Sequence, residues 1–141
     1  MPHNCQNLVI NCLDFRLQES LVSFLTALGL TNDYDLISVA GGALALACPK
    51  KKRDRDFILE QIEITVKKHG VNCVSIINHE DCGAYGGSQA FTSAKEEKEK
   101  HAKDLKLAKE VIGRKFSQIK IALYYAQKGA GNFQWSFERV E

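Results

Sequence analysis

The sequence predicts an α/β fold: a mainly parallel sheet, with four parallel strands and an antiparallel C-terminal edge strand, covered by helices on both faces. Short apolar runs rich in β-branched residues alternate along the chain with segments whose apolar residues recur at helical spacing. The early runs are continuously apolar, as in strands buried on both faces of a sheet, whereas the last run alternates with polar residues. Right-handed crossovers between successive strands then place helices on both faces of the sheet.

Each predicted strand is justified by its local sequence. The run 73–77 is short, β-branched and preceded by Gly70, which is typical of a buried strand. Gly41 and Gly42 follow the second strand and permit a tight turn or a close backbone approach. Turn residues at 128–132 precede the alternating run and predict a hairpin. The expected strands are 7–11, 35–39, 73–77, 119–125 and 133–137.

Two helices are predicted between the early strands. The first covers 17–28 and ends before Gly29. The second begins near Asp54, which we expect to cap it, and continues to Gly70, with basic residues 67–69 at its negative dipole end. The residues that define the two apolar stripes are Leu21, Val22, Leu25 and Leu28 in the first helix, and Ile58, Ile62 and Val66 in the second.

The third predicted helix begins with the segment 94–103, which is almost wholly charged. Its apolar stripe starts only afterwards, at Leu105, Ala108 and Ile112. We therefore expect its first turns to project into solvent or to lie against another subunit. The basic cluster 49–55 has no aromatic residues nearby and is expected to be a solvated loop.

Length and composition restrict the class of protein. The 141 residues, 45% of them hydrophobic, suit one domain with its own core, so we expect a single domain over residues 1–141. The net charge of +2 favours neither nucleic acid nor a membrane surface as a partner. Residues 1–7 lack an apolar signal core, and no apolar run approaches the roughly 18 to 20 residues of a membrane span, so a cytoplasmic location is expected. Five cysteines in a reducing compartment favour metal binding over disulfides.

Two of the predicted strands end in residues that can bind a metal ion. Cys12 follows the first strand, and His79 and Cys82 follow the third. Ligands bind at the carboxyl ends of strands in open α/β sheets, and these two strands can be neighbours, so two thiolates and one imidazole can converge. Zinc favours this set, and three protein ligands leave the fourth tetrahedral position open for water, as in catalytic sites. Such a water loses a proton near neutral pH and becomes a nucleophile.

Asp14 and Arg16 stand on alternate residues after Cys12, so both can point toward the same pocket. The guanidinium keeps the carboxylate ionised, and the ionised Asp14 can accept a hydrogen bond from zinc-bound hydroxide and orient it toward an electrophile. The remaining cysteines and histidines do not form a comparable group at the ends of predicted strands. Cys73 is expected in the core, Cys5 and Cys48 are expected to be incidental, and His3, His69 and His101 have no partners at metal spacing.

The pair of motifs Cys12-x-Asp14-x-Arg16 and His79-x-x-Cys82-Gly83 resembles the signature of the β-class carbonic anhydrases, and the order of elements fits that fold over nearly the whole chain. The resemblance implies Zn²⁺ held by Cys12, His79 and Cys82, a catalytic dyad of Asp14 and Arg16, and reversible hydration of carbon dioxide to bicarbonate. It also implies a homodimer or a larger homo-oligomer. The chain departs from the family pattern in three places: Phe15 replaces the usual Ser, Ser38-Val39 replaces a common Arg-Asn pair, and the first strand is expected almost at once, where the family has an N-terminal helical arm that wraps the partner subunit.

Other interpretations use the same residues. A hydrolase of carbonyl sulfide or carbon disulfide would keep the zinc chemistry and would be favoured by a narrower apolar access route. A non-catalytic zinc protein would use Asp14 as a fourth ligand and so close the open position. A thiol phosphatase is excluded, because Gln18 stands where that chemistry requires an Arg after Cys12.

Overall fold

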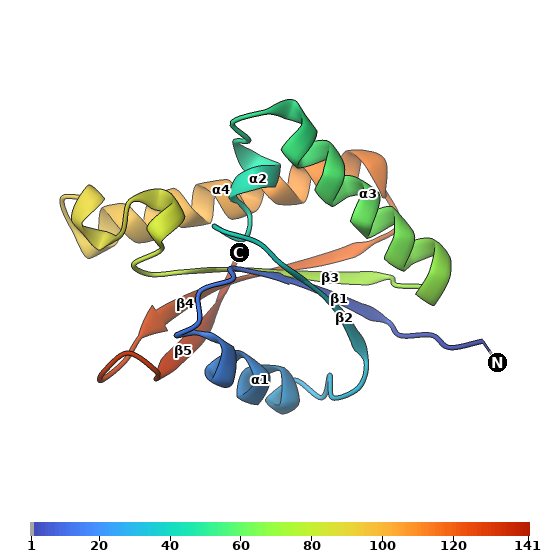
Figure 1. The fold of residues 1–141 in the computed structure, drawn as a ribbon, viewed down its shortest axis with the longest axis horizontal. Coiled ribbons are helices and arrows are strands. Elements are labelled where there is room, and N and C mark those ends of the chain that lie inside the picture. Colours follow the sequence, from blue (N-terminus) through green and yellow to red (C-terminus); the bar gives the residue numbers. More distant parts are fainter. Residues whose placement is uncertain (1) are drawn as a thin grey trace.

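The computed structural model describes residues 2–141, which form a five-stranded sheet in the order β2-β1-β3-β4-β5 (Figure 1). The predicted fold is confirmed: the first four strands run parallel and the last pairs antiparallel with β4. The strands are β1 (Asn7–Asn11), β2 (Tyr34–Ser38), β3 (Cys73–His79), β4 (Lys120–Lys128) and β5 (Trp135–Val140). Both β3 and β4 extend further at their carboxyl ends than the apolar runs suggested, and β5 begins at Trp135, after Phe133.

Helices cover both faces of the sheet, as predicted. In Figure 1, α1 (Gln18–Ala27) lies on one face, and α2 (Leu44–Ala47), α3 (Lys52–His69) and α4 (Ala94–Lys115) lie on the other. The two short 3₁₀ turns η1 (Gly83–Tyr85) and η2 (Ser88–Ala90) connect β3 to α4. Two apolar clusters form the core, one between the sheet and α2, α3 and α4, and one between the sheet and α1. Within residues 2–141, no helix combines the length and the apolar character that crossing a membrane requires.

The first two long helices depart from the predictions in their details. In α1, Leu21 and Leu25 are buried, but Val22 and the C-cap residue Leu28 are 57% and 43% exposed, because α1 alone covers its face of the sheet and buries only one narrow stripe. The prediction that Asp54 caps the next helix is wrong: α3 begins at Lys52, so Asp54 lies inside its first turn.

The basic cluster is not a solvated loop throughout. Its second half forms the first turn of α3, and Arg55 donates hydrogen bonds to the carbonyl oxygens of Leu46 and Ala47 at the end of α2. These carbonyls have no partner within so short a helix, so the guanidinium satisfies them.

The prediction for the start of α4 is also wrong. Glu97, His101 and Asp104 recur at helical spacing and are fully or almost fully buried, so these turns pack against the rest of the chain. The loop that follows β3 folds over them and provides polar partners, which a charged sequence alone does not reveal. Ser93 caps the helix by accepting a hydrogen bond from the Glu96 N–H.

Strands β1 and β3 are direct neighbours, paired in parallel from Asn7 with Cys73 to Ile10 with Ile76. Parallel neighbours end at the same edge of the sheet. The residues after β1 and at the end of β3 are therefore brought together, as the sequence predicted.

Candidate metal centre

Cys12, His79 and Cys82 converge at the carboxyl ends of the parallel strands, called here the carboxyl edge of the sheet. All three residues are buried. One ligand atom from each lies within 4.8 Å of the other two, and the two Sγ atoms are 3.9 Å apart. Thiolates on a tetrahedral zinc, with Zn–S bonds near 2.3 Å, stand about 3.8 Å from each other. The observed separation therefore fits a pair of metal ligands without rearrangement.

His79 presents a free nitrogen to this cluster. Its Nδ1 donates to the carbonyl oxygen of Glu80 at 2.7 Å, so in the neutral ring Nε2 is the unprotonated nitrogen. Nε2 is buried and has no hydrogen-bond partner among residues 2–141. A buried orphan acceptor is costly unless a cation or a proton satisfies it. The backbone bond at the other nitrogen fixes the ring as the supporting groups of metal-binding histidines do.

The two thiols lie close enough for each to shift the pKa of the other. The hydrogen bond from the Cys82 thiol lowers the pKa of Cys12, and the nearby His79 and the Gly41 amide lower it further, although burial opposes this. The pKa of Cys82 is raised in turn by its hydrogen bond to Cys12 and by burial. Burial disfavours a charged His79, but the neighbouring Cys12 thiolate more than offsets this and raises the pKa of the imidazole. A divalent cation would favour both thiolates and the neutral imidazole.

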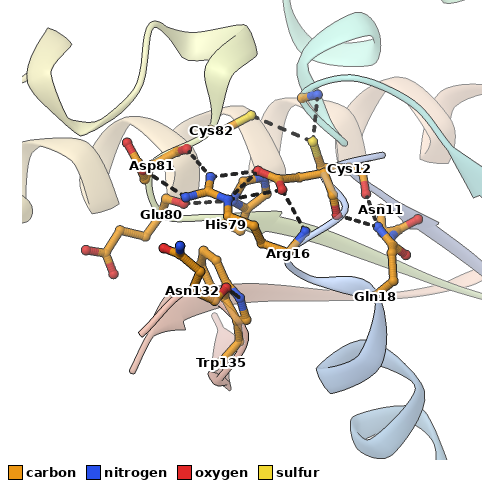
Figure 2. A network of polar contacts seen from close by, with 12 residues as sticks. Asn11, Cys12, Arg16, Gln18, His79, Glu80, Asp81, Cys82, Asn132 and Trp135 are labelled. Carbon is orange, nitrogen blue, oxygen red and sulfur yellow. Dashed lines mark hydrogen bonds and ion pairs between the residues drawn. The ribbon is translucent and has the colours of Figure 1, made fainter. Parts of the chain in front are cut away.

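Arg16 ties Asp14 to the loop after β3. Its Nη2 lies 2.7 Å from Asp14 Oδ2, and its Nη1 lies 3.1 Å from Asp81 Oδ2. Arg16 also donates to the Asp81 carbonyl oxygen, as Figure 2 shows around the labelled Asp81. The hydrogen bonds from Arg16 hold the pKa of Asp14 below its ordinary value despite burial. The predicted ion pair is therefore formed, and Asp14 Oδ2 lies 3.8 Å from His79 Nε2.

The turn after β1 is held by Gln18 and by the glycine pair. Gln18 Nε2 donates to the carbonyl oxygens of Cys12 and Asp14, at 3.1 and 2.7 Å (Figure 2). The Gly41 N–H donates to Cys12 Sγ at 3.4 Å. Gly42 has φ +58°, and a Cβ there would meet the Ile77 carbonyl oxygen at 2.6 Å. The close backbone approach that the two glycines permit is used to bring the β2 turn against β3.

Glu97 holds the loop that carries Cys82. Its carboxylate accepts hydrogen bonds from the Asp81 N–H at 2.7 Å and from the Ser88 hydroxyl at 2.9 Å. Asp81 has φ +58°, a conformation that costs a residue with a side chain about 1–2 kcal/mol, and Glu97 supports it. The charged face of α4 thus positions one of the candidate ligands.

A second polar group from α4 lies behind the cluster. Asn78 Nδ2 donates to His101 Nδ1 at 2.9 Å and to the Tyr85 hydroxyl at 3.1 Å, and Tyr85 donates to Asp104 at 2.8 Å. Burial lowers the pKa of His101 to about 4, with a smaller effect from the charge of His79, so His101 is neutral near pH 7. This network fixes Asn78, the residue immediately before His79.

Trp135 is a further site residue that the sequence did not reveal. Its ring lies edge-on to His79, with centroids 5.4 Å apart, and the Arg16 guanidinium lies 5.6 Å from the ring centroid (Figure 2). The alternating pattern identified Trp135 as part of an edge strand, but only the β4–β5 pairing brings it beneath the cluster.

An open cleft of about 780 Å³ leads to the cluster. The side chains of Leu13, Phe15, Ala40 and Ala84 make part of its lining apolar, while Asp14 and Arg16 form its polar side. Phe15, where the family pattern has Ser, points outward and is 76% exposed. It contacts Phe133 edge-on, at 6.1 Å between centroids, and makes the rim of the cleft apolar.

Some of the other cysteines and histidines lie in surroundings that differ from those predicted. Cys73 is only half-buried at the start of β3, and Cys48 is exposed. The prediction that His69 has no partners at metal spacing is wrong, because His69 lies together with Cys5 and Asp35 at the amino ends of the parallel strands.

Comparison with known proteins identifies the family. Residues 2–141 match the model of a family described as putative carbonic anhydrase. An uncharacterized protein from Rickettsia bellii (strain RML369-C) is 31% identical over 122 residues, which cover 84% of this chain and 74% of the relative. The solved carbonic anhydrase from Streptococcus mutans is similar, with a TM-score of 0.63 and 16% identity over 100% of this chain and 86% of that chain. The beta-carbonic anhydrase CcaA gives a TM-score of 0.56 and 12% identity over 89% and 70% of the two chains. This chain therefore belongs to the putative carbonic anhydrase family and has the fold of the β-class carbonic anhydrases.

Proposed function

We propose that this protein is a zinc enzyme that catalyses the reversible hydration of carbon dioxide to bicarbonate. The main support for the proposal is that the thiols of Cys12 and Cys82 lie close to the free Nε2 of His79. The Asp14 carboxylate, which Arg16 holds in place, lies beside them. Cys12, His79 and Cys82 would hold Zn²⁺, which when bound supplies the Lewis acidity that makes water nucleophilic near neutral pH.

Asp14 would orient the attacking water. Three hydrogen bonds from the Arg16 side chain hold its carboxylate, so Asp14 stays ionised and cannot rotate freely. Its Oδ2 lies 3.8 Å from His79 Nε2, and Asp14 lines the cleft, so the carboxylate would face a substrate that reaches the cluster. An ionised acceptor there takes a hydrogen bond from the water and directs the remaining lone pair toward the carbon of the substrate. Arg16 would act through Asp14 as its positioning residue.

The shape of the site supports carbon dioxide and an open metal position. Within a single chain, the cleft of about 780 Å³ gives no support to the narrow access route that carbonyl sulfide or carbon disulfide hydrolysis would favour. The four-ligand, non-catalytic interpretation requires Asp14 to leave Arg16 and turn to the metal. The close pairing of these two side chains supports a site in which Asp14 is not a ligand.

We also propose that the protein forms a homodimer or a larger homo-oligomer in the cytoplasm. The exposed apolar side chains at the rim of the cleft support the assembly, because Leu13, Phe15 and Phe133 are 58%, 76% and 57% exposed on one surface region.

The test is stopped-flow hydration of carbon dioxide by protein of known zinc content, over a pH range of about 6.5 to 9, which brackets an ionisation near 7. Turnover should rise with pH, because the nucleophile is the deprotonated form, and it should disappear when a chelator removes zinc. Asp14→Asn should keep its zinc and lose on the order of 100-fold or more of the turnover, as expected for a proton acceptor.

Two results would contradict this function. Full zinc content without hydration at any pH in the range would exclude carbon dioxide as the substrate. Normal turnover by Asp14→Asn would remove Asp14 from the mechanism while leaving the metal assignment intact.

A further inference from the structure

A second group of side chains that can bind a metal ion lies at the amino ends of the parallel strands, called here the amino edge of the sheet. It is at the opposite ends of the strands from the cluster of Cys12, His79 and Cys82. Cys5, Asp35 and His69 each place one ligand atom within 4.8 Å of the other two. Cys5 comes just before β1, Asp35 is the second residue of β2, and His69 is the last residue of α3. Figure 1 shows the N-terminal segment and the end of α3 at the same end of the sheet.

The backbone holds the three residues together. The Cys5 N–H donates to the carbonyl oxygen of His69 at 3.1 Å, which fastens the N-terminal segment to the end of α3. Asp33 accepts hydrogen bonds from the Gln6 N–H at 2.8 Å and from Asn7 Nδ2 at 3.2 Å, which fastens the same segment to the chain before β2. These contacts hold the three residues together through the backbone and Asp33. Two of the ligand atoms also have partners, because Cys5 Sγ donates to the Asn7 carbonyl oxygen at 3.6 Å and His69 Nδ1 pairs with Asp35 Oδ2.

The side chains are placed where an ion can reach them. His69 and Asp35 are 29% and 26% exposed, and Cys5 is half-buried against the core. His69 Nδ1 lies 2.6 Å from Asp35 Oδ2. Nitrogen and oxygen ligands on a tetrahedral zinc stand about 3.3 Å from each other, so an ion needs these two groups to separate by only about 0.7 Å. The ring of His3 lies 5.0 Å from that of His69 and offers a fourth nitrogen from the same segment.

We propose that Cys5, Asp35 and His69 bind a second divalent cation of the zinc class. One thiolate, one carboxylate and one neutral imidazole carry a charge of about −2, which balances such an ion, and sulfur and nitrogen ligands select zinc over magnesium or calcium. The ion would link the N-terminal segment, β2 and α3, so its role is structural. The inference does not depend on the proposed catalytic function.

The two sites cannot share one ion. Cys5 and Cys12 stand at opposite ends of β1, seven residues apart in the sequence, which corresponds to roughly 23 Å along an extended strand. Each site can therefore be removed by mutation without touching the ligands of the other.

The experiment is a Zn²⁺ titration of the metal-free full chain, with bound zinc measured per chain after removal of free metal. The wild type should bind two ions, Cys5→Ser and His69→Gln should each bind one, and Cys82→Ser should keep the ion at the amino edge. Cys48→Ser is the matched control, because Cys48 is exposed and lies outside both clusters, and it should still bind two. In Co²⁺-loaded protein, Cys5→Ser should lose part of the thiolate-to-cobalt absorption and keep the part from Cys12 and Cys82.

A wild type that binds no ion at saturating Zn²⁺, or only one ion that Cys5→Ser and His69→Gln both keep, would overturn the proposal and leave Asp35 and His69 as a simple ion pair. Two ions in both Cys5→Ser and His69→Gln would also overturn it. Circular dichroism of each variant checks that the fold is kept, and the use of two different ligands guards against a single variant that fails to fold. An absence of hydration activity would refute the proposed function without altering these counts.

Discussion

Replacing Gly42 with Ala should disrupt the contact between the β2 turn and β3. A Cβ at Gly42 would lie 2.6 Å from the Ile77 carbonyl oxygen and 2.7 Å from Asn78 Oδ1, inside the 3.0 Å limit that real Cβ atoms respect. Neither oxygen can move easily. Ile77 belongs to the central strand, and Asn78 Oδ1 accepts a hydrogen bond from the Ala43 N–H at 2.9 Å. The backbone must therefore shift by at least 3.0 − 2.6 = 0.4 Å.

The magnitude follows from two costs. A side chain at φ +58° costs about 1–2 kcal/mol, and overpacking of a rigid site costs a further ~1–3 kcal/mol. Gly42→Ala should therefore lower the free energy of unfolding by about 3 kcal/mol, roughly a 100-fold change in the folding equilibrium. Because Ile77 and Asn78 lead directly into His79, zinc affinity should fall as well.

Urea unfolding of three variants separates these costs. Gly29 has φ +78° but nothing within 4 Å of a built Cβ, so Gly29→Ala measures the backbone strain alone, about 1 kcal/mol. Gly113 lies inside α4 with open space around it, so Gly113→Ala should stabilise the protein by about 0.5–1 kcal/mol. Equal losses in Gly42→Ala and Gly29→Ala would refute the steric argument.

Three further predictions concern the surroundings of the cluster. Glu97→Ala should lower the free energy of unfolding, measured in urea, by about 2–4 kcal/mol, because it leaves the Asp81 N–H and the Ser88 hydroxyl without their charged acceptor. The control variant Glu99→Ala, on the exposed side of α4, should change that free energy by less than about 0.5 kcal/mol. The free energy of unfolding should fall as the pH drops from 6.5 toward 4, because the pKa of buried His101 is lowered to about 4 and the unfolded chain binds the proton more readily. His101→Gln should reduce this dependence on pH, and an unchanged dependence in that variant would contradict the role given to His101. Cys82→Ser should release zinc and lower the thermal midpoint, and full zinc content in that variant, measured by metal analysis, would exclude Cys82 as a ligand.

The main features of the candidate site could be predicted from the sequence because they depend on local order. Cys12 follows a buried apolar run directly and His79 ends another, so the rule that parallel strands end at one edge was enough to bring them together. Asp14 and Arg16 lie within four residues of Cys12, and their pairing required only a turn.

The support of the site could not be predicted in the same way. Glu97 and His101 are charged or polar residues in a charged segment, and the pattern of hydrophobic residues predicts that such side chains are exposed to solvent. They are buried because the loop after β3 folds onto α4 and satisfies them, and that contact joins Asp81 to a residue sixteen positions away. Trp135 reaches His79 only through the antiparallel pairing of the last two strands.

The α/β class, the order of the strands and of the three long helices, and the three side chains that converge at the carboxyl edge of the sheet could thus be predicted from the sequence. All of these follow from hydrophobic periodicity and from residues next to strand ends, whereas the short helix α2 was not predicted. Long-range packing is what buries Glu97 and His101 behind the cluster and brings Cys5, Asp35 and His69 together at the amino edge. Those three residues are 30 and 34 positions apart in the chain, and their meeting depends on how α3 returns to the sheet, a long-range packing outcome that no local pattern encodes.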